Sequence, residues 1–145
     1  MTAVAPAVVV LRALGLSDLL TAIPALRALA DAFPRHPRLL ATSATLAPLA
    51  RASGAVDEVV PADGLDQALP QCLHGATLAV NLHDRGPDSH QLLLATAPRR
   101  LVAFAHPAEN QGYVRLNLRD RERDGIVEPA DAPALLDRIA DGLRT

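Results

Sequence analysis

Cysteine, lysine and aromatic residues are scarce or absent in this chain of 145 residues. Its one cysteine, Cys72, excludes a disulfide within the chain and a multi-cysteine metal site, and a lone thiol fits a reducing compartment. Two phenylalanines and one tyrosine leave almost no surface on which bases or sugars could stack. Because 50% of the residues are hydrophobic, the core must be built mainly from alanine, leucine and valine.

Long apolar runs are absent as well. None approaches the roughly 20 residues that a membrane-spanning helix needs. The N-terminus lacks the basic segment of a signal peptide, and Arg12 interrupts its apolar stretch. We therefore expect a cytoplasmic protein without a transmembrane segment, for which peripheral contact with a membrane is left open.

Neither sign of charge is in large excess, since the formal net charge is −2. Arginine supplies all 14 basic residues, and these form no basic stripe along any one segment. Nucleic acid is therefore not an expected partner. The length itself favours one domain that is large enough to bury a core.

Apolar runs of strand length alternate with helical patterns along most of the chain. Such alternation predicts an α/β protein, with a parallel sheet and helices on both faces. The expected strands cover residues 8–11, 38–41, 56–60, 77–82 and 101–105. The expected helices cover residues 19–33, 44–52 and 65–73, and a fourth follows the polar loop 81–89 and runs to about residue 96.

The character of the chain changes near residue 108, after which Arg, Asp and Glu crowd a short tail. We divide the chain accordingly into a unit over residues 1–107 and a tail over residues 108–145, a candidate fusion segment. Within the tail, residues 113–119 alternate like a half-exposed strand, and residues 121–125 form a charged turn. An amphipathic helix is expected over 132–143, with Leu135, Leu136, Ile139 and Leu143 inward. Whether this tail docks on the sheet is left open.

One acidic residue, Asp18, follows the first expected strand and opens the first expected helix. Open α/β sheets collect catalytic groups at that position, so Asp18 could act as a general base. It could instead be a helix N-cap, as could Ser17, because both residue types satisfy free N–H groups there. From the spacing alone, the cap is the commoner role for an acidic residue at this position.

Four ordered stretches resemble glycosyltransferase family 9, the ADP-heptose:lipopolysaccharide heptosyltransferases and their relatives. Members begin with a strand, a basic residue, a Gly-Asp pair and a helix containing Pro-Ala-Leu. The stretches cover residues 10–29, with Arg12 and Asp18, and then residues 54–60, 81–89 and 98–104. The resemblance implies a Rossmann-like domain, the N-terminal, acceptor-binding half of a GT-B transferase.

The resemblance also implies a reaction and a set of site residues. Asp18 matches the family's general base, which deprotonates a hydroxyl of a glycan or lipopolysaccharide-type acceptor. A heptose-class sugar would pass with inversion from a nucleotide sugar, expected to be an ADP-sugar, without a metal or other cofactor. Arg12, Ser17, Arg85 and Ser89 are the expected acceptor contacts.

Three departures from the family pattern qualify these implications. Ser17 replaces the usual Gly, which would be strained if that backbone required a positive φ. Asp84 stands where relatives often have Gly. The residues after Pro107 are too few for the donor-binding domain, so the chain alone is expected to be inactive. The alternative is a non-catalytic α/β module, decayed or chimeric, that self-associates or binds a partner.

The remaining features carry less chemistry. Residues 110–129 resemble a late segment of alkaline-phosphatase-superfamily phosphodiesterases, with Asp120 in place of Gly. That segment lacks the superfamily's metal ligands and nucleophile, so it implies a fusion and no hydrolase activity. His83 and His90 flank the 81–89 loop without a metal-ligand spacing, and we assign no metal. Cys72 is expected to be a small core residue.

Overall fold

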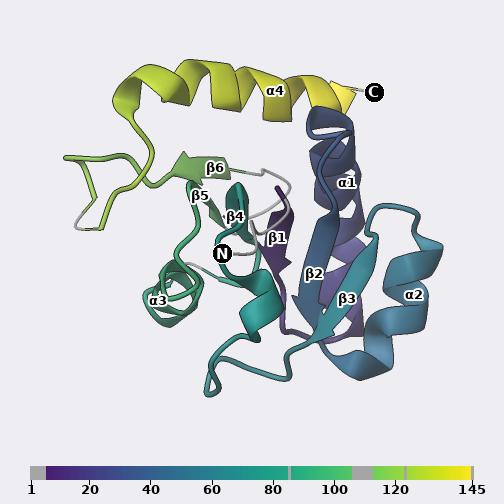
Figure 1. The fold of residues 1–145 in the computed structure, drawn as a ribbon. Coiled ribbons are helices and arrows are strands. Elements are labelled where there is room, and N and C mark those ends of the chain that lie inside the picture. The colour runs from purple at the N-terminus through teal and green to yellow at the C-terminus, as the bar shows by residue number, and fades with distance from the viewer. Residues whose placement is uncertain (1–5, 85, 106–112, 123, 145) are drawn as a thin grey trace.

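The computed structural model describes residues 6–84, 86–105, 113–122 and 124–144 and shows a Rossmann-like α/β fold (Figure 1). One six-stranded sheet has the strand order β3-β2-β1-β4-β5-β6. The first five of these are parallel, and β6 is antiparallel to β5. The strands are β1 (Val8–Leu11), β2 (Arg38–Thr42), β3 (Glu58–Pro61), β4 (Leu78–Asn81), β5 (Leu101–Ala105) and β6 (Tyr113–Leu116).

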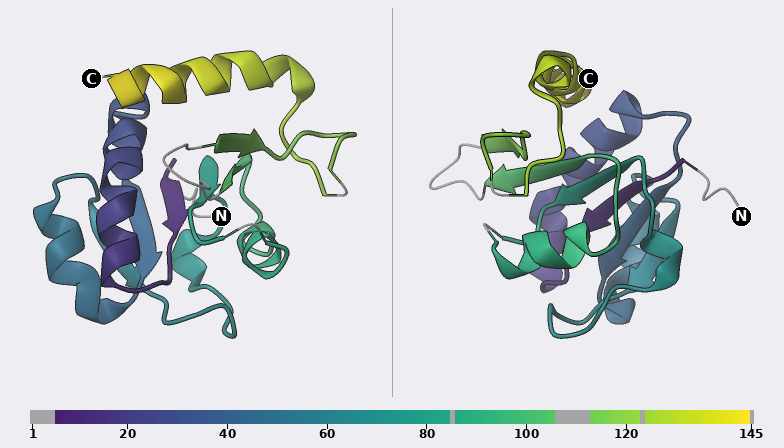
Figure 2. Two further views of the ribbon diagram at one scale, coloured as in Figure 1. Left: turned by 180° about the vertical axis from the view of Figure 1, so that it is seen from behind. Right: turned by 60° about the vertical axis from the view of Figure 1, so that its left-hand side comes forward.

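Helices cover both faces of the sheet, as the alternating pattern predicts. On one face lie α1 and α4, and α3 lies on the other (Figure 2). The helices are α1 (Leu16–Ala32), α2 (Ala47–Ala52), α3 (Asp88–Leu94) and α4 (Ala132–Arg144). A 3-10 turn precedes α2 at Ala44–Leu46, and another precedes α4 at Pro129–Asp131.

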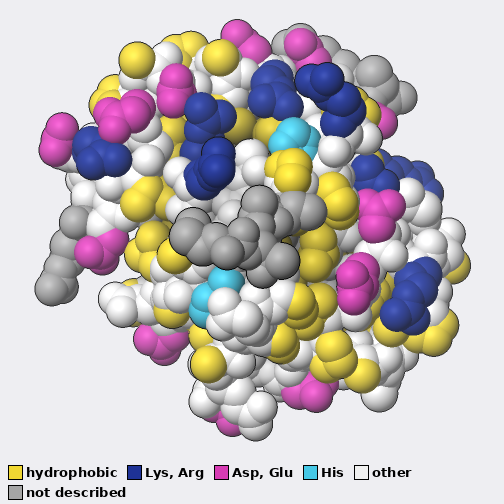
Figure 3. Space-filling view, viewed as in Figure 1, with side chains coloured by type: hydrophobic (Ala, Val, Ile, Leu, Met, Phe, Trp, Pro, Cys, Tyr) yellow, Lys and Arg dark blue, Asp and Glu magenta, His cyan; other side chains and the backbone are white. Residues whose placement is uncertain are grey.

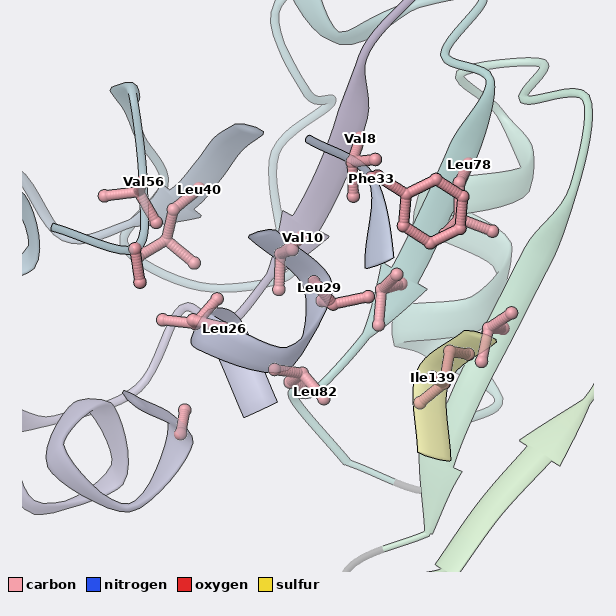
Figure 4. Close-up of a cluster of buried hydrophobic side chains, with 14 of the residues drawn as sticks. Val8, Val10, Leu26, Leu29, Phe33, Leu40, Val56, Leu78, Leu82 and Ile139 are labelled. Atoms are coloured by element: carbon pink, nitrogen blue, oxygen red, sulfur yellow. The ribbon is translucent and has the colours of Figure 1, made fainter. Parts of the chain in front are cut away.

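The central strand β1 explains why the sheet is buried on both sides. Successive side chains of a strand point to opposite faces. Val8 and Val10 pack in the core under α1, whereas Val9 and Leu11 pack in the core under α3. Figure 4 shows the first of these cores, with β1, β2, β4, α1 and α4 all contributing: Val8, Val10, Leu26, Leu29, Phe33, Leu40, Leu78 and Ile139.

The charged tail docks on the sheet, which the sequence left open. Strand β6 pairs with β5, and α4 packs across α1. The Arg138 guanidinium lies 4.0 Å from the Phe33 ring centroid and donates a hydrogen bond to the Ala32 carbonyl. The expectation that Leu136 points inward is wrong. That side chain is exposed, because the buried stripe follows Leu135 and Ile139 at four-residue spacing.

Two other expectations need correction. The helix expected over 65–73 is absent, and only a 3-10 turn forms there, at Gln71–Leu73. Pro70 precedes this turn, and a proline inside a helix removes a hydrogen bond and clashes with the preceding turn. The first helix, expected from residue 19, begins at Leu16 and includes Pro24.

Candidate functional site

The site lies where the strand order reverses. Strand β1 has β2 on one side and β4 on the other, and the chain returns to β4 only after β3. The loops after β1 and β4 therefore leave neighbouring strand ends toward opposite faces of the sheet, and open α/β sheets bind their ligands at this point of the carboxyl edge. Leu11 and Asn81 pair at the ends of these two strands. We call the side chains around these loops the switch-point site: Arg12, Asp18, Thr21, His83, Asp84 and Ser89.

Arg12 joins the two loops from inside the protein. Its side chain is only 8% exposed. Nε donates to the backbone carbonyl of Asp18 at 2.7 Å, and Nη1 donates to the carbonyl of Leu82. Nη2 donates to Thr21 Oγ1 at 3.2 Å and lies 3.4 Å from Asp18 Oδ1. Burial lowers the pKa of Arg12, and the Asp18 carboxylate opposes that shift. The donors of this expected acceptor contact are thus aimed at the protein itself.

Asp18 is a partly exposed acid of the site. It occupies the first turn of α1, whose N-cap is Gly15 with no side-chain capping bond, so neither Asp18 nor Ser17 is the cap. The Asp18 side chain is 38% exposed, and its Oδ1 faces Arg12. Ser17 is exposed and lies within the right-handed helix α1. Its φ is not positive, so a residue other than glycine causes no backbone strain there.

Gly15 keeps the second oxygen of Asp18 open. Its φ is −77°, a value that any residue adopts, so the glycine is not required by backbone conformation. A Cβ built at this position would lie 3.9 Å from Asp18 Oδ2. Larger side chains would therefore stand beside that oxygen. Among the described residues Oδ2 has no hydrogen-bond partner, which leaves it available to a ligand.

His83 was singled out in the sequence only as a residue without a metal-ligand spacing, and its burial and its contact with the first loop were not predicted. The residue is 9% exposed, and Nδ1 accepts a hydrogen bond from the backbone N–H of Ala13 at 3.2 Å. Burial lowers the pKa of His83; Asp84 and Asp18 oppose the shift and Arg12 adds to it. The imidazole is therefore neutral at neutral pH. The signal in the sequence was its place, two residues beyond the last buried residue of the fourth strand.

The second loop is held by a buried hydroxyl. Ser89 is fully buried, donates to Asp84 and accepts a bond of 2.7 Å from Asn81 Nδ2. Burial alone raises the pKa of Asp84, but the bonds from Ser89 and the Gly86 N–H, with His83 and His90 nearby, hold it below its ordinary range. The structure thus places the expected acceptor contact Ser89 in an internal network. Arg85, the remaining expected contact, lies outside the described residues.

Other classes of site find little support in the described chain. Over the residues with assigned positions, no group of three or more His, Cys, Asp or Glu could hold a metal ion. Cys72 is exposed in the 71–73 turn, so its expected place in the core is wrong. On the face shown in Figure 3, arginine and acidic side chains are interspersed. No helix in the described part is long and apolar enough to cross a membrane.

Comparisons of the chain with protein-family models, curated proteins and solved structures give no significant match. A functional assignment therefore depends on the resemblance of its motifs and on the chemistry of the switch-point site. That chemistry consists of an accessible carboxylate, a neutral imidazole and a buried guanidinium that holds both loops. Such a set can accept a proton from a hydroxyl and can bind polar ligands without a metal.

Proposed function

We propose that this chain is the acceptor-side part of an inverting sugar transferase related to glycosyltransferase family 9, with Asp18 as its general base. The observation that carries the proposal is the Asp18 carboxylate, which is 38% exposed and lies 3.4 Å from a buried guanidinium at the switch-point site. The motif resemblance over residues 8–107 and the Rossmann-like sheet support it. The acceptor class is a glycan or glycolipid, and the co-substrate is an ADP-sugar of the heptose class.

The reaction assigns one step to the described residues. Asp18 Oδ2 accepts the proton of an acceptor hydroxyl while that oxygen attacks the anomeric carbon of the donor sugar. The bond from the sugar to the nucleotide diphosphate breaks on the opposite face, so the configuration inverts and the diphosphate leaves with the electron pair. Arg12 holds the carboxylate through Oδ1 and keeps Oδ2 free for the proton. General-base catalysis of this kind contributes about 10²–10⁴ in rate. A second domain would hold the nucleotide sugar.

The test measures transfer with the donor half supplied separately. The chain is mixed with a donor-binding domain of the same family, an ADP-heptose and a lipopolysaccharide-core oligosaccharide, and the product is measured by mass spectrometry. Asp18→Asn should lower kcat by about 10²-fold or more while acceptor binding changes little. Asp88→Asn is the matched control, because Asp88 is also an exposed acid in the first turn of a helix at this sheet edge. Transfer by Asp18→Asn at the wild-type rate would exclude the proposal.

A second candidate function is a non-catalytic module that self-associates. One observation favours it: Leu16 and Leu20 are exposed one turn apart on α1, beside Asp18. Apolar side chains at such positions can pair between copies. Sedimentation velocity over a range of concentrations separates the two candidates. A module of this kind dimerises, loses dimerisation in Leu20→Gln, and shows no transfer that depends on Asp18.

A further inference from the structure

Resting on the proposed function, we propose that His83 is the second ligand contact of the switch-point site. Its neutral imidazole donates a hydrogen bond from Nε2 to an oxygen of the same sugar whose reacting hydroxyl binds Asp18 Oδ2. The site would thereby recognise a polyol through one acceptor and one donor. The argument depends on the tautomer of the ring, its placement and the access of Nε2 to solvent.

The tautomer follows from the bond to Ala13. A backbone N–H can only donate, so Nδ1 of His83 must supply a lone pair to it at 3.2 Å. A neutral imidazole that accepts at Nδ1 carries its proton on Nε2. Burial, together with Arg12, keeps the pKa of this ring below its ordinary value, although Asp84 and Asp18 act in the opposite direction. The ring therefore presents one N–H donor at neutral pH.

The placement follows from the network around Arg12. Nη1 of Arg12 binds the carbonyl of Leu82, the residue just before His83, and Nη2 faces the Asp18 carboxylate. Ala13, which holds the imidazole, is the residue just after Arg12. One guanidinium and its neighbouring peptide therefore fix both the carboxylate and the imidazole. The two side chains share one small region at the ends of β1 and β4.

Access to Nε2 completes the argument. Among the described residues, no protein group binds Nε2. The fully buried polar atoms that lack a partner do not include Nε2. The residue as a whole is 9% exposed, and because Nε2 is not among those buried atoms, we place this exposure at the edge of the ring that carries the N–H group. A donor in such dry surroundings binds an oxygen more strongly than one in water. This is the geometry expected of a ligand contact.

Two substitutions separate ligand binding from a purely structural role. His83→Asn places an amide oxygen near the position of Nδ1, which preserves the bond to Ala13 and removes the distal donor. His83→Gln places an amide nitrogen near the position of Nε2, which preserves the distal donor and weakens the bond to Ala13. If His83 only stabilises the loop, His83→Gln should lower the stability of the chain more than His83→Asn. If His83 contacts the ligand, His83→Asn should weaken ligand binding more than His83→Gln.

The experiment is an NMR titration of the ¹⁵N-labelled chain with methyl α-D-mannopyranoside. We expect amide shifts in residues 13–21 and 83–84, binding about tenfold weaker in His83→Asn, and binding within about threefold of wild type in His83→Gln. Long-range ¹H–¹⁵N spectra should show the proton of His83 on Nε2. A proton on Nδ1, or wild-type binding by His83→Asn, would overturn the proposal.

The outcomes also separate this inference from the proposed function. If transfer depends on Asp18 but His83→Asn changes neither glycoside binding nor the acceptor KM, only the assignment of His83 fails. If the glycoside shifts no resonance around the switch-point site and Asp18→Asn leaves transfer unchanged, the proposed function fails, and the His83 contact fails with it.

Discussion

Replacing Arg12 by methionine tests whether this guanidinium holds the switch-point site together. The side chain is 8% exposed and donates to two backbone carbonyls and one hydroxyl. Methionine fills a similar volume but donates nothing. The carbonyl of Leu82 then loses its charged donor, whereas the carbonyl of Asp18 keeps its bond of 3.0 Å from Thr21 Oγ1.

The expected loss can be estimated from these contacts. Hydrogen bonds to charged groups are worth about 1.5–3 kcal/mol each, and an orphaned buried acceptor costs about 1–3 kcal/mol. With one acceptor orphaned and a second weakened, Arg12→Met should lower the free energy of unfolding by about 3–5 kcal/mol. That loss is a large share of the free energy of unfolding of a typical domain, which is about 5–15 kcal/mol. Urea denaturation followed by circular dichroism measures the change.

Two companion variants make the experiment decisive. Asp18→Asn should cost less than about 1 kcal/mol, because it removes one long contact to a partly exposed side chain and leaves the carbonyl bonds of Arg12 in place. Arg12→Lys should fall between the two, since one ammonium keeps the charge but cannot span both loops. A loss below about 1 kcal/mol for Arg12→Met would refute the reasoning. So would equal losses for Arg12→Met and Asp18→Asn.

Three further predictions concern other residues. The pKa of His83 lies below its ordinary 6.5 because of burial, so protonation of this residue favours the unfolded chain. The contribution of His83 to the free energy of unfolding should be constant above about pH 6.5 and should decrease as the pH falls below that value. In urea denaturation at a series of pH values, His83→Asn should remove this contribution. Gly142→Ala should lower the Tm despite alanine's better helix propensity, because its Cβ would lie 2.3 Å from the Ala28 carbonyl oxygen; a raised Tm would mean that α4 does not pack on α1 this closely. Gly15→Val should weaken glycoside binding at Asp18 without unfolding the chain, with Gly15→Ala as the control; equal binding by both variants would show that Oδ2 is not the contact.

The sheet could be predicted because its signal is local. A run such as residues 8–11 is apolar throughout, and a run of that length is typical of a strand buried on both faces. The helix expected at 65–73 had the same kind of support, with leucines four residues apart. Leu69 and Leu73 are indeed buried, but in an irregular loop and a single 3-10 turn. The spacing of the leucines predicted their burial correctly but predicted the wrong backbone conformation, because Pro70 disfavours a helix through this segment.

The site was predictable only in part, for a related reason. Asp18 could be found because it follows a strand and opens a helix, which are neighbours in sequence. The state of His83 depends on Ala13, 70 residues earlier in the chain. Neither its tautomer nor its burial leaves a trace in the residues around it. Long-range contacts decide the chemistry of a side chain, and the pattern of one segment does not contain them.

The position of Arg12 sharpens what the site can be. Burying a guanidinium costs free energy that its hydrogen bonds only partly offset, and a buried ion pair often stabilises a fold no more than apolar side chains that replace both partners together. What an apolar residue cannot do is bind two loops and a carboxylate at once, as Nε and both terminal nitrogens of Arg12 do. Because those atoms are engaged by the protein, ligand contacts should be sought at Asp18 Oδ2 and His83 Nε2. The arginine then acts on a ligand through the groups that it positions.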